Sequence, residues 1–510
     1  MIEKPIDKEF NTEADGTERF SASFLNDLVD AHTRKIAPKY RKYQNLYEGK
    51  HKILNKKPKD KNKPNNRLVN DFYGQTIDNT VGYFLGNPVI LNYTEPKEEK
   101  PAVEVEPVDV GVDMEELEDT EVQDFIDYLM VDNDMEDVII EWGKEAMIKG
   151  LSHLLVYQNE ESKTKVMRLS PEDVILVYKN SSTKELQYAI RLYDIDTEDT
   201  DKTTHYAEVY SVGKMELFKS VETSTAPQRG KGREFASYEF VSEESIIYSR
   251  IPIVTMYNNE EQMSDLEKIK TLVEDYDKVL SDVSDEFSVF RNAYLMLKNM
   301  IVGENGKKQL KEEGIIEVME NGDVKFITKQ IQTEALENHL NRLENNIYKF
   351  SQVPNLSDEN FAGNLSGVAI RFKLFGLETK CIIKERKMEK ALRDFVRVLA
   401  VPIRVSTGHE VDIVNLKVEF TRNVPNNLTE LVDTVTKLNG TVDKETLLSL
   451  LPFIDNPKEV LEKLEAENKK QKEDTDPYSQ ENIEADSNNL FSNFGSFFEG
   501  STQTEGNTEE

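Results

Sequence analysis

The residues of this chain that could carry out chemistry are few and lie far apart in the sequence. No two histidines stand at the spacing of metal ligands, and the zinc-protease sequence H-E-x-x-H is absent. The six histidines occupy positions 32, 51, 153, 205, 339 and 409. We therefore expect no metal site built on them.

An acidic run that begins at Asp132 matches part of a calcium-binding loop. Asp132, Asp134, Glu136 and Asp137 supply closely spaced carboxylates. A calcium loop also needs a glycine at its sixth position and a bidentate glutamate at its twelfth, and both are missing here. Surface charge is the better interpretation, and we expect no bound metal.

Features of nucleotide hydrolysis and of nucleophilic catalysis are absent as well. The sequence GENGK at 303–307 is shorter than the phosphate loop G-x-x-x-x-G-K-[ST], and no G-x-S-x-G occurs. The single cysteine, Cys381, lies on an expected long helix without a fixed histidine partner, so we expect a packed, inert thiol. The chain is predicted not to be an enzyme and to need no cofactor.

The composition is that of a large, polar protein. The chain has 510 residues, of which 31% are charged, and its mean hydropathy is −0.60. This length predicts about two to four domains. One cysteine excludes an intrachain disulfide and favours an intracellular folding compartment. No apolar leader and no run of eighteen apolar residues occur, so we expect no signal peptide and no membrane span.

Charge is distributed unevenly along the chain, whose net charge is −32. Residues 95–137 hold eighteen acids against two lysines, and residues 465–510 hold twelve acids against three lysines. Residues 34–67 are basic, with thirteen Lys and Arg against Glu48 and Asp60. This asymmetry points to electrostatic partners or neighbouring subunits, although solvated loops explain the acidic parts at least as well.

The hydrophobic periodicity predicts an α+β fold. Amphipathic helices are expected over 17–47, 67–85, 120–131 and 135–149, with a flexible basic loop after residue 50. Between residues 150 and 257 the period shortens to two, which indicates a β-rich domain. The expected strands are 153–158, 165–169, 174–178, 187–193, 206–211, 215–219 and 251–257, after a short strand over 89–93.

The clearest helical signal begins at Ser264. Ser264–Glu267 matches a capping box, and apolar residues then keep a 3-4 spacing up to Leu297. Asn-Gly at 321–322, between alternating runs at 315–319 and 324–328, predicts a β-hairpin. A second helix of matching period is expected over 333–350. Two long helices thus enclose a small α/β module.

A polar loop over 351–367 follows the second of these helices. Its sequence, SQVPNLSDENFAGNLSG, has no hydrophobic period, which is typical of a functional loop held between rigid helices. A third long helix is expected from Ser366 until Pro402 stops it, with a kink at Gly376.

The third helix carries a basic face that we interpret as solvated. The face consists of Lys380, Lys384, Lys387, Arg393 and Arg397. Beyond the helix we expect a strand over 411–420, short helices over 428–438, 443–451 and 457–468, and disorder from residue 470.

Several stretches together resemble the portal proteins of tailed double-stranded DNA bacteriophages, of the type found in phages of Gram-positive bacteria. The stretches are YEGKH at 47–51, PNNR at 64–67, VGYFLGNP at 81–88, IPIV at 251–254, NN at 258–259, SDLE at 264–267 and SGVAIR at 366–371. Each is weak alone. Their order, and their setting of helix, small module, helix, loop and long helix, carry the resemblance over roughly residues 20–465.

The resemblance implies a protomer of a closed ring, typically of twelve subunits, at one vertex of the capsid. The implied parts are a wing over 1–263, a stem helix over 264–298, a clip over 299–332, a second stem helix over 333–350, a tunnel loop over 351–365, a long kinked helix with a wing strand over 366–427, a crown over 428–468 and a disordered acidic tail over 469–510.

Function and partners follow from the same resemblance. The ring would be the channel through which double-stranded DNA is packaged and later ejected. Its partners would be terminase, head-completion (connector), major capsid and scaffold proteins, in a virion assembled in the host cytoplasm.

The resemblance also implies two sets of site residues. The tunnel loop would face DNA through Gln352, Asn355, Ser357, Asp358, Glu359, Asn360 and Asn364. The clip would dock the motor or the connector through Lys307, Lys308, Lys311, Asn321, Asp323 and Lys325.

The polarity of the loop suits this role physically. A protein that holds DNA neutralises phosphates with Lys and Arg, so a channel that lets DNA slide should avoid such contacts. We predict that Asp358 and Glu359, with the neighbouring asparagines, form a weakly repelling, hydrated collar.

Two other functions are compatible with the residues. A structural adaptor or scaffold of a virion, without a pore, would use the same long helices and acidic tail, and only ring closure separates it from a channel. A DNA-processing enzyme would use the basic segment 34–67 and a carboxylate metal site. It is less favoured, because no convergent set of Asp, Glu and His supports it.

Overall fold

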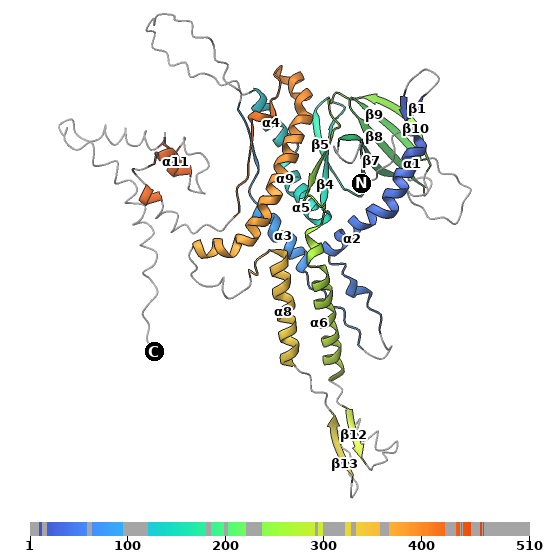
Figure 1. Cartoon of the computed structure of the whole chain (residues 1–510), viewed down its shortest axis with the longest axis vertical. Helices are drawn as coiled ribbons and strands as arrows, with labels where there is room; N and C mark the ends of the chain where they lie inside the picture. The colour runs from blue at the N-terminus through green and yellow to red at the C-terminus, as the bar shows by residue number, and fades with distance from the viewer. Residues whose placement is uncertain are drawn as a thin grey trace, which may run out of the picture. The chain divides into compact units, whose positions relative to one another are not determined.

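A computed structural model shows a mixed helix and sheet protein, which confirms the expected fold class at that level (Figure 1). The residues that the structure describes are 10–12, 18–58, 64–94, 121–179, 185–197, 202–220, 237–290, 294–298, 322–327, 333–356, 367–423, 435–438, 440, 442–449, 460–461 and 463. They fall into two units. One consists of Met1–Asp358 with Lys373–Asn423, and the other of Glu359–Phe372 with Val424–Glu510.

The larger sheet has five antiparallel strands in the order β10-β9-β8-β7-β6. Its strands are β6 (Val174–Tyr178), β7 (Leu186–Thr197), β8 (Lys202–Ser211), β9 (Lys214–Ser220) and β10 (Tyr238–Ser245). Strand β10 was not predicted, because several of its residues are charged and its hydrophobic alternation is weak. The sheet forms one wall of the main hydrophobic core.

The N-terminal helices cover this sheet. Helix α1 (Ala22–Ala31) begins where the Ser21 side chain accepts a hydrogen bond from the Phe24 amide, and Phe24 and Leu28 pack against the sheet. A π-helical turn at His32–Ile36 joins it to α2 (Ala37–Tyr47). The helix expected from residue 17 is wrong at its start, where β2 (Glu18–Phe20) pairs with β1 (Phe10–Thr12).

The smaller sheet has three antiparallel strands in the order β11-β4-β5. They are β11 (Ile253–Tyr257), β4 (Leu151–Gln158) and β5 (Thr164–Leu169), and helices α4 (Glu121–Asp132) and α5 (Met135–Lys149) precede them. Gly150, at φ +96°, turns α5 into β4. A Cβ there would lie 2.3 Å from the Gln262 carbonyl oxygen, so both backbone conformation and space require glycine.

Helix α3 (Phe72–Leu85) and a two-stranded sheet complete this region. The helix was expected from residue 67, but it begins at Phe72, because the Asp71 side chain accepts the Gly74 amide and caps it. Strand β3 (Ile90–Tyr93) pairs with β14 (Leu416–Glu419). The strand expected over 411–420 is shorter than predicted, because Ile413–Asn415 form a 3-10 turn capped by Asp412.

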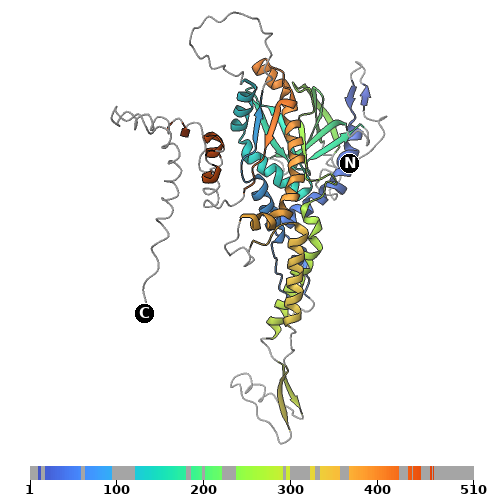
Figure 2. The same ribbon diagram turned by 60° about the vertical axis from the view of Figure 1, so that its left-hand side comes forward.

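Two long helices, α6 (Lys270–Phe290) and α8 (Thr333–Ser351), lie side by side (Figures 1 and 2). The first was expected to reach residue 298, and that is wrong. Tyr294–Lys298 form β12, which pairs with β13 (Asp323–Ile327). The run YLMLK is compatible with a strand as well as with a helix. Pairing with β13 provides hydrogen-bond partners for its backbone N–H and C=O groups. The hairpin partner expected at 315–319 lies outside the described residues.

A third long helix, α9, runs without interruption from Gly367 to Thr407. The expectation that Pro402 ends it is wrong. Proline removes a single backbone donor, and the fully buried Ile403 holds the last turns in place. In the second unit, α11 (Lys444–Ser449) packs Leu447 and Leu448 against Val435. No helix among the described residues is long and apolar enough to cross a membrane.

Candidate functional site at the base of the paired helices

Aromatic residues of α3 hold the base of α6 and α8. The ring of Phe72 meets Tyr276 of α6 edge to face at 5.1 Å between centroids, and Tyr348 of α8 at 6.0 Å. The Tyr348 hydroxyl also donates to the Gln75 side chain. Such pairs contribute about 0.5–1.5 kcal/mol beyond their buried area. The first turn of α3 therefore fixes the spacing of the two helices.

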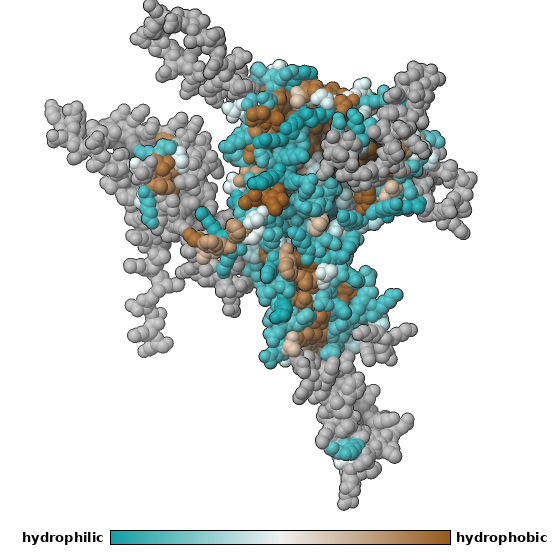
Figure 3. Space-filling model, in the orientation of Figure 1, coloured by the Kyte–Doolittle hydropathy of each residue, from teal (hydrophilic) through white to brown (hydrophobic). Residues whose placement is uncertain are grey.

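Hydrophobic residues gather on the visible face of the helix pair, along the groove between α6 and α8 (Figure 3). Partly exposed apolar side chains occur on both helices, including Val283 on α6 and Leu340 on α8. Phe287, near the end of α6, is 52% exposed. Exposed apolar surface of this kind is typical of a helix pair that meets further protein.

A buried cluster of charges joins the start of α6 to α9. Asp265 lies in the 3-10 turn just before α6, and its carboxylate oxygens are each 2.9 Å from a lysine Nζ, one from Lys380 and one from Lys384. The side chains are 8%, 10% and 3% exposed, respectively. Asn258 donates to the same carboxylate at 2.8 Å and accepts from Lys384. We call these four side chains the Asp265 cluster.

The cluster reaches the root of the polar loop through Lys380. Its ammonium donates to the carbonyl oxygen of Ser351, the last residue of α8, and to the Thr80 hydroxyl of α3, both at 3.2 Å. A lysine on a terminal helix carbonyl satisfies an acceptor that the helix leaves free. One ammonium therefore connects α9, α3, the end of α8 and the start of α6.

Neighbouring charges oppose the effect of burial on the ionisable groups of this cluster. Burial alone would raise the pKa of Asp265, but the charges of Lys380 and Lys384 outweigh it and hold that pKa well below its usual range. Burial lowers the pKa of Lys384, and the attraction of Asp265 opposes that change. The solvated basic face expected on this helix is therefore wrong at Lys380 and Lys384, because both ammoniums turn inward to a carboxylate.

The polar loop has an ordered root. Gln352 adopts a left-handed conformation at φ +61° and ends α8, and the Ser351 hydroxyl accepts the amide of Val353 at 3.3 Å. Val353 is buried, and the Asn355 side chain donates to Glu344 at 3.5 Å. Of the predicted DNA-facing residues, Gln352 and Asn355 lie on this root. The others, Ser357, Asp358, Glu359, Asn360 and Asn364, lie outside the described residues.

The predicted docking residues of the small module are placed only in part. Asp323 and Lys325 lie on β13, opposite Lys298 and Met296 of β12. Lys307, Lys308, Lys311 and Asn321 lie outside the described residues. The structure therefore brings two members of this set onto one strand.

The basic segment after α2 binds the acidic face of α6. Asp277 is buried and accepts from the His51 ring at 2.6 Å and from the Asn70 amide at 2.9 Å. Asp285 accepts from the Asn66 amide and from Lys56 Nζ. The flexible loop expected over 51–66 is therefore wrong for 51–58 and 64–66, the parts of it that the structure describes. The only feature of the sequence that could have predicted this contact is the opposite charge of the two distant segments.

The remaining candidates for chemistry have structural roles. His153 bonds to the Thr255 hydroxyl, and His32 to the Glu172 carbonyl oxygen. Asp132 accepts from Lys165. Cys381 is fully buried, which confirms the expected packed thiol, and burial raises its pKa to about 12. Among the described residues, no three His, Cys, Asp or Glu side chains converge on a possible metal site.

The arrangement is that of a structural protein whose long helices, loop root and sheets are connected by buried ionic contacts. The family described as "Phage portal protein, SPP1 Gp6-like" matches residues 26–474. The chain belongs to this family. It is 26% identical over 426 residues to the portal protein of Bacillus phage SPP1, covering 80% of this chain and 77% of that protein. It is also 26% identical over 314 residues to the portal protein of Clostridium phage phiCD119, covering 59% of this chain and 66% of that protein.

Proposed function

We propose that this chain forms the ring-shaped channel at one vertex of a phage capsid, through which double-stranded DNA is packaged and later ejected. The observation that carries the proposal is the family match over 26–474.

The proposal assigns a role to each part of the protomer. Helices α6 and α8 are the stem of the channel, and the segment between them, with β12 and β13, is the clip that meets terminase and later the connector proteins. The sheets and N-terminal helices are the wing, which faces capsid and scaffold proteins, and residues 428–468 are the crown. The ring has twelve subunits.

The loop after α8 is the tunnel loop, which surrounds the DNA. Its ordered root, from Gln352 to Asn355, supports this role because the Asp265 cluster fixes where the loop leaves α8. Asp358 and Glu359 supply negative charge at the DNA surface, so the loop contacts the duplex without holding it.

Complementation in a phage separates the channel from an adaptor without a pore. A phage that lacks this protein is grown with and without a plasmid copy, and the heads are analysed for DNA. A channel protein predicts heads without DNA that become filled on complementation. Heads that are filled in its absence but lack tails would instead support the adaptor.

A further inference from the structure

The outer edge of strand β11 carries unused backbone hydrogen-bonding groups. β11 is the edge strand of the three-stranded sheet. The backbone N–H of Asn258 donates to the Gly150 carbonyl oxygen, and the Pro252 carbonyl oxygen accepts from the backbone N–H of Val156. The backbone N–H and C=O groups of the even-numbered residues of β11 therefore point toward β4. Backbone groups alternate along an antiparallel strand, and those of residues 253, 255 and 257 therefore point away from β4.

A cavity of about 550 Å³ follows this edge. Ile253, Val254 and Thr255 all line it. Consecutive side chains of a strand point to opposite faces of the sheet. Three consecutive lining residues therefore place the cavity along the strand, where its backbone contributes to the wall. Its volume is within the range of about 300–1,000 Å³ that is usual for binding sites.

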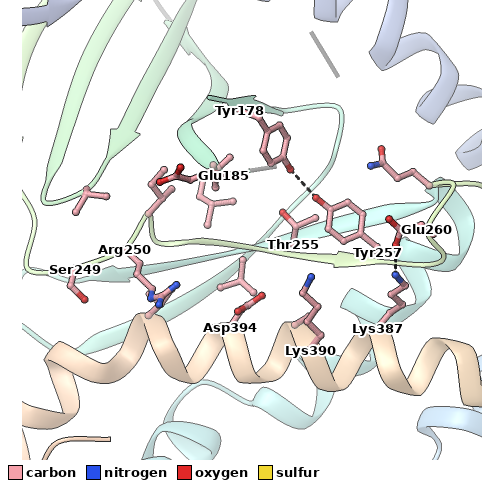
Figure 4. Close-up of a pocket in the computed structure, with 18 of the residues that line it drawn as sticks. Tyr178, Glu185, Ser249, Arg250, Thr255, Tyr257, Glu260, Lys387, Lys390 and Asp394 are labelled. Atoms are coloured by element: carbon pink, nitrogen blue, oxygen red, sulfur yellow. Dashed lines mark hydrogen bonds and ion pairs between the residues drawn. The ribbon is translucent and has the colours of Figure 1, made fainter. Parts of the chain in front are cut away.

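Helix α9 forms the opposite wall (Figure 4). Lys387, Lys390 and Asp394 lie on α9 on the side that faces the strand bearing Thr255 and Tyr257. The hydroxyls of Tyr178 and Tyr257 are hydrogen-bonded at 2.8 Å. The strand edge and the helix thus enclose an elongated groove.

The charges of the groove favour an acidic occupant. Of the charged residues in the lining, Lys387 pairs with Glu260, Asp394 with Arg397 and Glu185 with Lys179. Arg250 and Lys390 are exposed and have no ion-pair partner in the part of the chain that the structure describes. Arg250 and Lys390 can therefore form ion pairs with carboxylates of a bound molecule at this strand edge.

We propose that this groove binds an extended, acidic peptide segment of a partner protein, which adds to the sheet as a strand beside β11. Main-chain hydrogen bonds to Ile253, Thr255 and Tyr257 supply affinity, and such pairing is an established mode of peptide recognition. Ile251, Leu186 and Val398 offer apolar contact to the alternate side chains of the peptide. Arg250 and Lys390 select acidic residues. The inference goes beyond the channel function and stands without it.

The test uses the full-length protein and the peptide fluorescein-EVEVEV-amide, labelled at its N-terminus. We expect saturable binding and slower amide exchange of segment 251–258 when the peptide is present. The double variant Arg250→Glu/Lys390→Glu should weaken binding at least tenfold, whereas Arg386→Glu, an exposed charge on α9 outside the groove, should not. The basic peptide acetyl-KVKVKV-amide should bind more weakly than the acidic one.

Two N-methylated peptides test the strand pairing itself. Methyl groups on one set of alternate amides should abolish binding, and methyl groups on the other set should leave it, because only one edge of the added strand faces β11. Equal binding of the two would overturn the proposal. The proposal would also be overturned if no binding occurred at millimolar peptide, or if the double variant bound the peptide with unchanged affinity. A third contrary result is protection of 251–258 from amide exchange that rises with protein concentration in the absence of peptide. That result would show that the strand edge forms contacts between copies of this chain.

Discussion

Lys380 and Asp265 form a buried ion pair, 2.9 Å between Nζ and Oδ2, that joins the middle of α9 to the turn preceding α6. The same ammonium binds the last carbonyl oxygen of α8, where the polar loop begins. A change in the position of α9 would therefore displace both the start of α6 and the end of α8. This contact is the physical basis of the first prediction.

Replacing Lys380 by Met should destabilise the protein strongly. Asp265 keeps its contact with Lys384, but one of its carboxylate oxygens and the Ser351 carbonyl oxygen lose their donor, and a buried acceptor left without a partner costs about 1–3 kcal/mol. The matched control is Lys387→Met, which breaks the more exposed pair with Glu260 and should cost about 0–1 kcal/mol. Urea unfolding at equal protein concentration compares the two. Equal losses in the two variants would contradict the role of the Asp265 cluster.

Stability should fall in mild acid because of His153. Burial, assisted by the nearby charge of His32, lowers the pKa of His153 to about 3, so the folded state keeps the ring neutral. The unfolded chain binds a proton below about pH 6.5, and between these values it holds more protons than the folded state. The free energy of unfolding should therefore decrease by up to about 1.4 kcal/mol for each unit of pH lost in this window.

The variant His153→Gln isolates this contribution. Unfolding free energies at pH 6.5 and pH 5.5 should differ by about 1 kcal/mol less in the variant than in the natural protein. The comparison concerns the change of unfolding free energy with pH. Any pH-independent cost of losing the hydrogen bond to Thr255 therefore cancels. Identical slopes would show that His153 does not titrate differently on folding.

The basic segment 51–70 should detach from α6 when its acidic partners are removed. Asp285 accepts from both Asn66 and Lys56, so Asp285→Ala should raise the rate of proteolysis within this segment several-fold. High salt should act in the same direction, because partly exposed ion pairs are screened. Glu243→Ala, which removes a partner of Lys214 in the larger sheet, is the control. Unchanged cleavage in the Asp285 variant would refute the contact.

On the proposed role of the loop over 351–365, reversing its charge should slow DNA packaging. In the double variant Asp358→Lys/Glu359→Lys each subunit gains two cations that can neutralise phosphates, and the duplex should then be held instead of sliding. Asp358→Asn/Glu359→Gln, which removes charge without adding any, should package nearly normally. The amount of DNA per head at fixed times is the readout. Normal packaging by the lysine variant would disprove the collar.

Local signals were read well from the sequence. The helix at Met135–Lys149 and the strand at Val174–Tyr178 match their predicted bounds, because each has a strong period and clear end signals. The capping box at Ser264 was only half right. Ser264 caps a 3-10 turn by accepting from the Leu266 amide, and Glu267 accepts from the Tyr43 hydroxyl instead.

Contacts between distant segments could not be predicted. Nothing near Lys384 in the sequence shows that its charge meets Asp265, more than a hundred residues away. The same holds for His51 and Asp277. Periodicity tells which face of a helix is apolar, whereas a buried polar contact depends on the tertiary fold that brings its partners together.

Negative-stain electron microscopy of the purified full-length protein tests the central claim most directly. A portal subunit repeats one heterologous contact until the rotation closes. The account predicts closed rings with an axial hole, of about twelve subunits. Monomers, or open and irregular assemblies without a hole at any protein concentration, would contradict it.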